Sequence, residues 1–164
     1  MSTGLQPRWP DIYTALLALF PTLPGFRGGP RGDVAVYDGQ SVSDDQPIDF
    51  VTVGFQTDEG AGSFAQQWDP SGFGTVESGD LRCLIDSNSG DTDPLSVGVD
   101  RARAFAMFAV LQNAILTDQT LGGALTGSNV RIELAAQIIS DQNTAGFAQS
   151  LLVTLTYQVT TYFT

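Results

Sequence analysis

Apolar residues recur at helical spacing near the start of the chain. Ile12 and Leu16 lie one turn apart and follow Pro10 and Asp11, a proline and an acid that suit the first turn of a helix. This pattern predicts a short helix over residues 11–20.

A second, longer helix is predicted over residues 95–117. Its apolar stripe consists of Ala104, Phe108, Leu111 and Ile115, widened by Phe105, Met107, Val110 and Ala114. The polar side chains are assigned to the wetter side: Asp100, Arg101, Arg103, Gln112 and Asn113. So wide an apolar face indicates a helix that lies across a sheet.

Alternation of apolar and polar residues predicts the strands. It marks residues 33–37, 49–55, 76–85, 130–138 and 153–160. The last two segments are joined by a short connection, so we expect them to form a long antiparallel hairpin. A stretch rich in glycine and aromatic residues, 60–74, lies between the second and third strands, and we expect it to pack rather than to act as a solvated linker. At 164 residues without a break in composition, the chain is expected to form a single domain over 1–164.

The C-terminal strand is unusual because no residue from 142 to 164 is charged. Long uncharged strands without lysine or proline tend to pair with other chains when they lie at a sheet edge. Two interpretations remain open: the strand is central in its own sheet, or a neighbouring subunit completes its surface. On the second interpretation the candidate interface residues are Leu155, Tyr157, Val159 and Tyr162.

The charge balance changes the range of possible functions. The chain has 7 arginines, 18 acids and no histidine or lysine, which gives a net charge of −11. So negative a protein is not expected to grip nucleic acid, and the lack of histidine removes the usual general base and the commonest zinc ligand. No phosphate-binding or nucleophile motif is present. We therefore expect no enzyme activity, no catalytic residues and no cofactor.

Two features resemble chemical sites but have simpler explanations. The acidic turn over 86–93 has oxygen ligands, yet it lacks the glycine and the terminal glutamate of a calcium-binding loop, so we expect a solvated turn with Asp93 capping the following helix. Cys83 is a lone cysteine within a predicted strand, where a small buried side chain is the usual role. No metal site is expected.

The order of these segments resembles the tail terminator proteins of long-tailed (siphovirus-type) bacteriophages, particularly those of actinobacterial phages. Three groups of residues carry the resemblance. The first is 36–39 followed by 49–54, and the second runs from 79–83 to 89–91. The third is the helical segment 101–116, which is followed by 120–123 and the two closing strands. It implies an α+β fold, mainly antiparallel β-sheet packed by one long and one short α-helix, in a ring-forming subunit.

The function implied by this resemblance is structural. Subunits would form a six-fold homo-oligomeric ring in the virion that caps the tail tube and joins the tail to the head, after assembly in the host cytoplasm. The implied partners are further copies of the chain, the tail tube protein and a neck or head-completion protein, with double-stranded DNA passing through unbound and no membrane involved. Four acids are candidates to line the channel: Asp44, Asp45, Asp58 and Glu59. Another neck (head–tail connector) or tail-tube protein is the alternative, and a small calcium- or ligand-binding module is a remote one.

Overall fold

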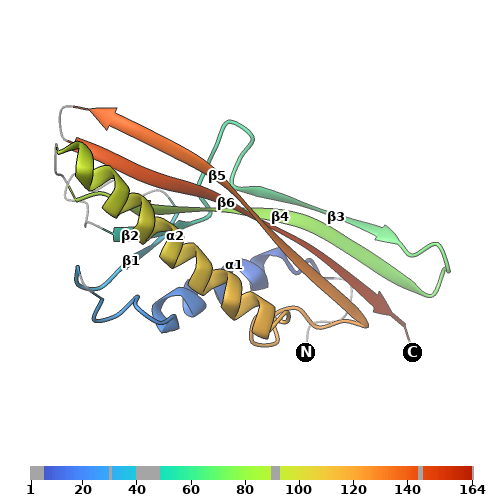
Figure 1. Cartoon of the computed structure of the whole chain (residues 1–164). Helices are drawn as coiled ribbons and strands as arrows, with labels where there is room; N and C mark the ends of the chain where they lie inside the picture. Colours follow the sequence, from blue (N-terminus) through green and yellow to red (C-terminus); the bar gives the residue numbers. More distant parts are fainter. Residues whose placement is uncertain (1–5, 30, 40–48, 90–92, 144–145, 164) are drawn as a thin grey trace.

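The protein forms two layers, a β-sheet and a pair of helices that cover one of its faces (Figure 1). The computed structural model describes residues 6–29, 31–39, 49–89, 93–143 and 146–163, with only the backbone at 140–143 and 146–148. The helices are α1 (Trp9–Leu19), a 3-10 turn η1 (Phe20–Thr22) and α2 (Pro94–Thr117). The strands are β1 (Ala35–Asp38), β2 (Asp49–Val53), β3 (Gly62–Trp68), β4 (Gly74–Ser87), β5 (Asn129–Asn143) and β6 (Gly146–Tyr162). The predicted α+β class, with a mainly antiparallel sheet and one long and one short helix, is confirmed.

The strands belong to a single mixed sheet in the order β1-β2-β4-β6-β5, and β3 also pairs with β4. β4 has two neighbours on one side, because its C-terminal half pairs with β2 and its N-terminal half with β3. β1 and β2 run parallel, whereas the other pairs are antiparallel. Among the described strands, the open edges are therefore β5 on one side of the sheet and β3 and β1 on the other.

The first helix begins two residues before its predicted start and places Pro10 in its first turn. Ile12 and Leu16 are buried against the sheet, as their spacing predicts. The side chain of Tyr13 donates a hydrogen bond to the carbonyl oxygen of Val53, at 3.0 Å. Its ring occupies the space in which a side chain at Gly54 would lie, so the helix packs closely on the end of β2.

The long helix α2 has nearly the predicted length, and three of the residues assigned to its wetter side, Arg101, Gln112 and Asn113, are exposed, but Asp100 is not. Asp93 caps it, as expected, by accepting a hydrogen bond from the backbone N–H of Leu95. Its buried stripe is Asp100, Ala104, Met107, Leu111 and Ile115. The assignment of Asp100 to the solvent-facing side is wrong, because ionic partners from distant segments allow this carboxylate to be buried.

The two closing strands form the predicted antiparallel hairpin, in register from end to end. β6 lies between β4 and β5, so the interpretation that it is central in its own sheet is confirmed. Its alternate residues from Leu151 to Val159 face the helices and form the middle of the core. This placement explains why an uncharged strand is tolerated here, since it presents no free edge.

The aromatic stretch over 60–74 contains β3, a strand that the sequence pattern did not predict. The expectation that it packs is wrong for its aromatic side chains: Phe64, Trp68 and Phe73 are 47%, 68% and 72% exposed. The far end of β3 and the start of β4 extend beyond the helices (Figure 1), whereas the first residue of β3, Gly62, lies beside Trp9 of α1.

Candidate assembly surfaces and buried charges

Three of the four predicted interface residues are not available to a neighbouring subunit. Leu155, Tyr157 and Val159 are at most 2% exposed, because they lie on the side of β6 that the helices cover. The prediction that they form a subunit interface is therefore wrong, and they are part of the chain's own core. Tyr162, near the end of β6, is 49% exposed and remains a candidate for contact with another chain.

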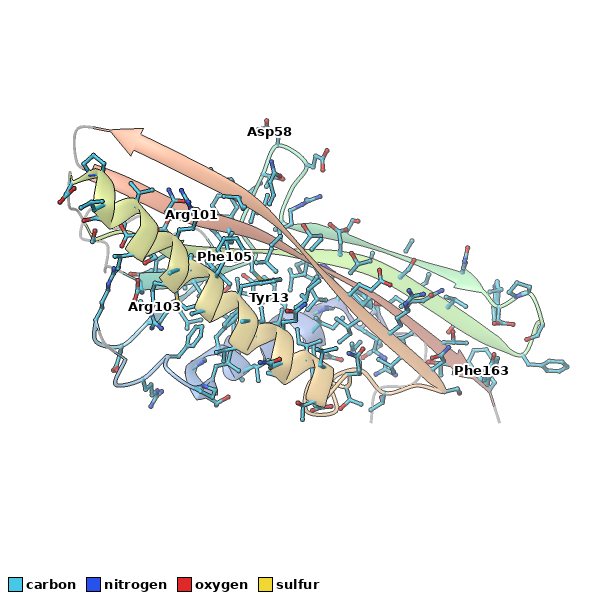
Figure 2. The ribbon with its side chains drawn as sticks, viewed as in Figure 1. Tyr13, Asp58, Arg101, Arg103, Phe105 and Phe163 are labelled. Atoms are coloured by element: carbon cyan, nitrogen blue, oxygen red, sulfur yellow. The ribbon has the colours of Figure 1, made fainter. Side chains whose placement is uncertain are left out.

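The predicted channel acids fall into two groups. Asp44 and Asp45 lie outside the described residues. Asp58 and Glu59 are exposed in the loop between β2 and β3, which projects from the sheet on the side away from the helices (Figure 2). Glu59 accepts a hydrogen bond from the guanidinium of Arg82 at 3.1 Å, so the loop is anchored while its carboxylates face solvent.

A buried ionic network joins the loop after α1 to the sheet and to α2. The Arg31 guanidinium lies 2.7 Å from Asp100 and 3.7 Å from Asp49, and the Arg103 guanidinium lies 3.0 Å from Asp49. The hydroxyl of Ser87 donates to Asp49 at 2.7 Å. Two arginines thus balance two buried acids, and the network holds three segments that are distant in sequence. Its role is structural, because its polar atoms are occupied by one another.

The pairing of Arg31 could not be read from the sequence. The glycine-rich run that contains this residue predicts only a loop, and the acids that bind it are 18 and 69 positions away along the chain. Their meeting depends on the parallel placement of β1 beside β2 and on the position of α2 over the sheet.

A third buried carboxylate, that of Glu77 on β4, accepts three hydrogen bonds. It accepts hydrogen bonds from the Tyr157 hydroxyl at 2.7 Å, from the backbone N–H of Arg8 at 2.8 Å and from the Gln66 amide at 2.8 Å. Burial, together with the hydrogen bond that the Tyr157 hydroxyl donates to Glu77, raises the pKa of Tyr157 well above its usual range. The cluster ties β3 and the start of α1 to the middle of the sheet.

Asp86 is a fourth buried acid, near the end of β4, and it accepts a hydrogen bond from the Ser150 hydroxyl. Burial raises its pKa to about 6, and the nearby charges of Asp100 and Asp49 act in the same direction, although the bond from Ser150 opposes them. The acidic turn that begins here lies partly outside the described residues. Within the described part of the chain, no group of acids, cysteines or histidines is placed to hold a metal ion.

Replacing Asp86 with asparagine is expected to stabilise the protein in a pH-dependent way. The pKa of Asp86 is about 6 in the folded protein and close to 4 in the unfolded chain, so the folded state favours the protonated acid. The resulting stabilisation is fully present below about pH 4 and is lost as the pH rises through 6, because the buried acid must then ionise. Above that pH the variant should gain roughly 1–3 kcal/mol over the wild type. Urea unfolding of both proteins at pH 4.5 and pH 8 measures this difference, and an equal difference at both pH values would contradict it.

Cys83 is buried in β4, as predicted, and burial raises its thiol pKa to about 12. At neutral pH it is a protonated, small apolar side chain of the core.

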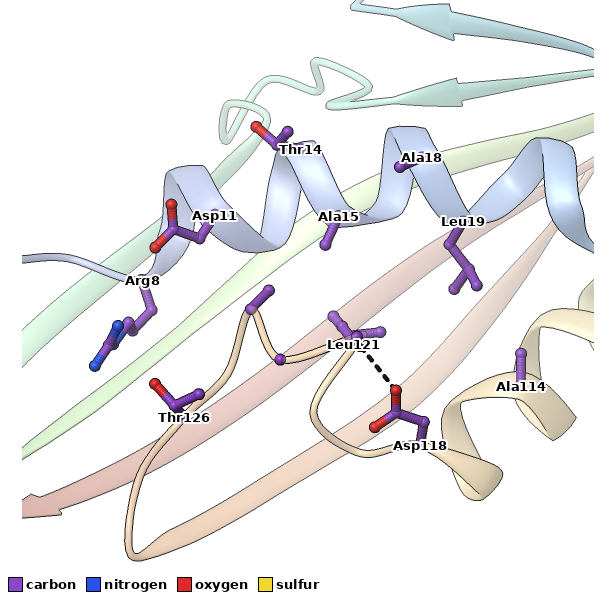
Figure 3. A pocket seen from close by; sticks show the side chains of 13 residues that line it. Arg8, Asp11, Thr14, Ala15, Ala18, Leu19, Ala114, Asp118, Leu121 and Thr126 are labelled. Atoms are coloured by element: carbon purple, nitrogen blue, oxygen red, sulfur yellow. Dashed lines mark hydrogen bonds between the residues drawn. The ribbon is translucent and has the colours of Figure 1, made fainter. Parts of the chain in front are cut away.

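A cleft of about 800 Å³ lies between α1 and the loop that follows α2 (Figure 3). Small residues form much of its wall: Ala15, Ala18, Ala114, Gly122, Gly123 and Ala124. The carboxylate of Asp118 accepts hydrogen bonds from the backbone N–H groups of Thr120 and Gly122 and from the Thr120 hydroxyl. The Asp118 carboxylate therefore stabilises the loop that follows α2, and its oxygens are engaged by that loop and not by a ligand.

Large apolar side chains are exposed at both open edges of the sheet. Along β3 and at its far end lie Phe64, Trp68, Phe73, Tyr162 and Phe163, which we call the aromatic edge. Trp68 and Phe163 contact each other edge to face, with their ring centroids 5.9 Å apart. A group of exposed rings as large as this is uncommon on a monomeric protein and is typical of a surface that another protein covers.

The opposite edge has a groove between α2 and β5. α2 lies over β4 and β6, so it covers the inward side of β5 only in part: Ile132 is buried, whereas Ile138, further along the strand, is 56% exposed. The described part of the groove, about 310 Å³ in volume, is lined by Gln112, Ile115, Leu116, Gln119, Ile132, Glu133 and Leu134. We call this the α2–β5 groove. The rest of α2 also exposes apolar residues, Leu95 and Val99, so the helix is apolar on its outer side as well.

No protein-family model matches the chain, and no curated protein matches it. Neither helix of the described residues is both long and apolar enough to span a membrane.

Proposed function

We propose that this protein is a structural subunit that assembles into a ring, and that the ring is the tail terminator of a long-tailed bacteriophage. Its neighbours would be the tail tube protein on one side and a neck or head-completion protein on the other. The resemblance in the order of sequence segments supports the identity of the particle. The fold and the exposed surfaces support the assembly.

The observation that carries the proposal is the exposure of large apolar side chains at both open sheet edges. A single patch of this kind allows a symmetric dimer, because the same patch serves both partners. Two unlike patches on one subunit allow a head-to-tail contact, which closes into a ring when the rotation between neighbours is suitable. The aromatic edge and the α2–β5 groove provide two such patches.

The charge of the protein fits passage of DNA through the ring. A channel with acidic walls repels phosphates, so DNA can move through it without sticking. Asp58 and Glu59 are exposed on the side of the sheet away from the helices, and we propose that this side faces the channel.

The hairpin formed by β3 and β4 favours the alternative of a tail-tube protein. It extends past the helical layer, as an arm that contacts the next ring would do (Figure 1). The two functions predict different assemblies, since a terminator forms single rings whereas a tube protein stacks its rings into tubes.

Negative-stain images of the purified protein distinguish these functions. Single closed rings would support the terminator, and stacked tubes would support the tube protein. Separate particles of single-chain size at micromolar concentration would contradict both.

Replacing Asp58 and Glu59 with lysine is expected to make the ring retain DNA. Each added lysine that reaches a phosphate releases a counterion, so retention should be strong at low salt and fall steeply as salt rises. A pull-down of linear duplex DNA across a salt series measures this. Replacing the exposed helix residue Asp11 with lysine is the control, because the helical layer lies on the opposite face of the sheet. Intact rings of the double variant that bind no more DNA than this control would show that the loop does not face the channel.

A further inference from the structure

We propose that the aromatic edge of one copy docks in the α2–β5 groove of the next copy, with Trp68 and Phe64 inserted between α2 and β5. This inference rests on the proposed ring assembly and names the two surfaces that would form each contact.

The groove has the shape and the chemistry to receive an aromatic strand. Figure 2 shows Phe105 and Arg101 on the side of α2 toward β5 and β6, and Phe105 is 39% exposed. Across from them, β5 presents Leu134 and the exposed Ile138 on the same face of the sheet. No backbone neighbour from the described residues covers the outer edge of β5. The groove therefore combines apolar side chains on both walls with the polar Gln112, Gln119 and Glu133, and it has an open side through which a second strand can approach.

The aromatic edge presents its rings on the matching face. Phe64 and Trp68 pair with Gly79 and Thr75, which are on the face of β4 that also bears the core residues. Ile138 pairs with Leu151, which is on this same face. If β3 of one copy lies beside β5 of another with the two sheets continuous, its rings enter the groove on the helical side. The seven residues of β3 carry no charge and no proline to prevent that approach.

The charges around the two surfaces are complementary. Arg101 is exposed beside the groove and has no ion pair within the described part of the chain. Asp69 follows Trp68 directly, and its carboxylate caps the turn by accepting a hydrogen bond from the N–H of Ser71 at 2.8 Å. Hydrogen bonds from the Ser71 side chain and from this N–H lower the pKa of Asp69, so the residue is ionised at neutral pH. Docking of the rings would bring this acid toward Arg101 of the neighbour.

A second copy is the occupant that fits both surfaces. A chain of net charge −11 repels its own copies at long range, so the contact needs apolar burial and a local charge pair. The aromatic edge has the acid and the groove has the arginine, so each copy presents one half of the contact at each side of its sheet. An isologous dimer would use both surfaces only if the aromatic edge of each copy reached the groove of the other at the same time, and the two surfaces lie on opposite sides of the sheet.

A charge-exchange experiment tests this contact. The single variants Arg101→Asp and Asp69→Arg each place like charges together, and each should weaken assembly at least tenfold in the concentration needed for half-maximal ring formation. The double variant should assemble within about threefold of the wild type. An equimolar mixture of the two single variants should assemble as well, because opposite charges meet at every contact of a ring with an even number of subunits.

Two controls separate this contact from general charge effects and from misfolding. Arg27→Asp makes the same charge change on an exposed loop and should leave assembly unaltered. Asp69→Asn keeps a side-chain acceptor for the turn and should show an intermediate effect. Circular dichroism checks that each variant folds, which matters most for Asp69 because its half-buried side chain caps a turn, whereas Arg101 is exposed.

The possible outcomes distinguish this inference from the proposed function. Rings of the wild type together with single variants that assemble normally would overturn the inference and leave the ring intact. Weakened single variants that neither the double variant nor the mixture restores would overturn the inference too, because the two residues would then act at separate places. A wild-type protein that stays monomeric would overturn the proposed function and the inference with it.

Discussion

Replacing Asp100 with alanine is expected to lower the free energy of unfolding by about 3–5 kcal/mol. The carboxylate is completely buried and accepts hydrogen bonds from Arg31 at 2.7 Å and from the Ser89 hydroxyl at 3.0 Å. Without it, the partly buried Arg31 guanidinium loses its closest ionic partner and faces Asp49 at 3.7 Å alone. Against the 5–15 kcal/mol that stabilises a typical domain, this loss is large.

Urea unfolding followed by circular dichroism, at matched protein concentration, measures the loss. Matched concentration is necessary because assembly adds stability to the folded state. Asp58→Ala is the control, since this acid is exposed and its loss should change the unfolding free energy by less than about 0.5 kcal/mol. A value for Asp100→Ala within 1 kcal/mol of the wild type would show that the network does not hold the loop, the sheet and α2 together.

Replacing Trp68 with alanine is expected to weaken assembly by roughly 30-fold or more while leaving the subunit folded. Tryptophan is among the residues whose truncation most weakens an interface, often by 2 kcal/mol or more. Trp68 is 68% exposed in the isolated chain, so its removal costs the monomer only its contact with Phe163. The effect should therefore appear in association and not in monomer stability.

Gln67→Ala provides a matched control for this prediction. Gln67 is adjacent, equally exposed on β3, and points to the opposite face of the sheet. Sedimentation velocity over a concentration series compares the two variants. Equal association by Trp68→Ala and Gln67→Ala would mean that the aromatic edge is not a contact surface.

The sequence predicted the elements well where local pattern determines them. The period of α2, its cap at Asp93 and the alternation in the last two strands depend only on neighbouring residues, and each is confirmed. The pattern missed β3, because its alternation is broken by glutamines and small residues and no side of it is buried. A strand that buries neither of its faces has no need for alternating apolar and polar residues, so the pattern that predicts strands is absent.

The candidate site was harder to predict than the fold, because its location depends on the order of the strands. The uncharged C-terminal segment is central because β4 covers one side of it and β5 the other, and sequence period alone does not reveal which strands are at the edges. The surface that is open to a partner is instead the aromatic edge. Its signal was the number of aromatic residues in a glycine-rich segment, for which burial within the same chain was the expected explanation.

The burial of Asp100 also depends on the arrangement of distant segments and could not be predicted from the local sequence. On a helix, a charged side chain is normally assigned to solvent, and only the approach of Arg31 from a loop makes burial possible. That approach is a long-range property of the fold. No local spacing indicates it.

The molar mass of the purified protein in solution is the most direct test of the claim that this chain is a self-assembling ring subunit. Light scattering after size-exclusion chromatography, repeated over a wide range of protein concentration, gives this mass without assuming a shape. The proposed function predicts a discrete species at six times the chain mass of 17.4 kDa, which persists on dilution. A single species of 17.4 kDa at every concentration, with the aromatic edge exposed to solvent, would contradict the claim.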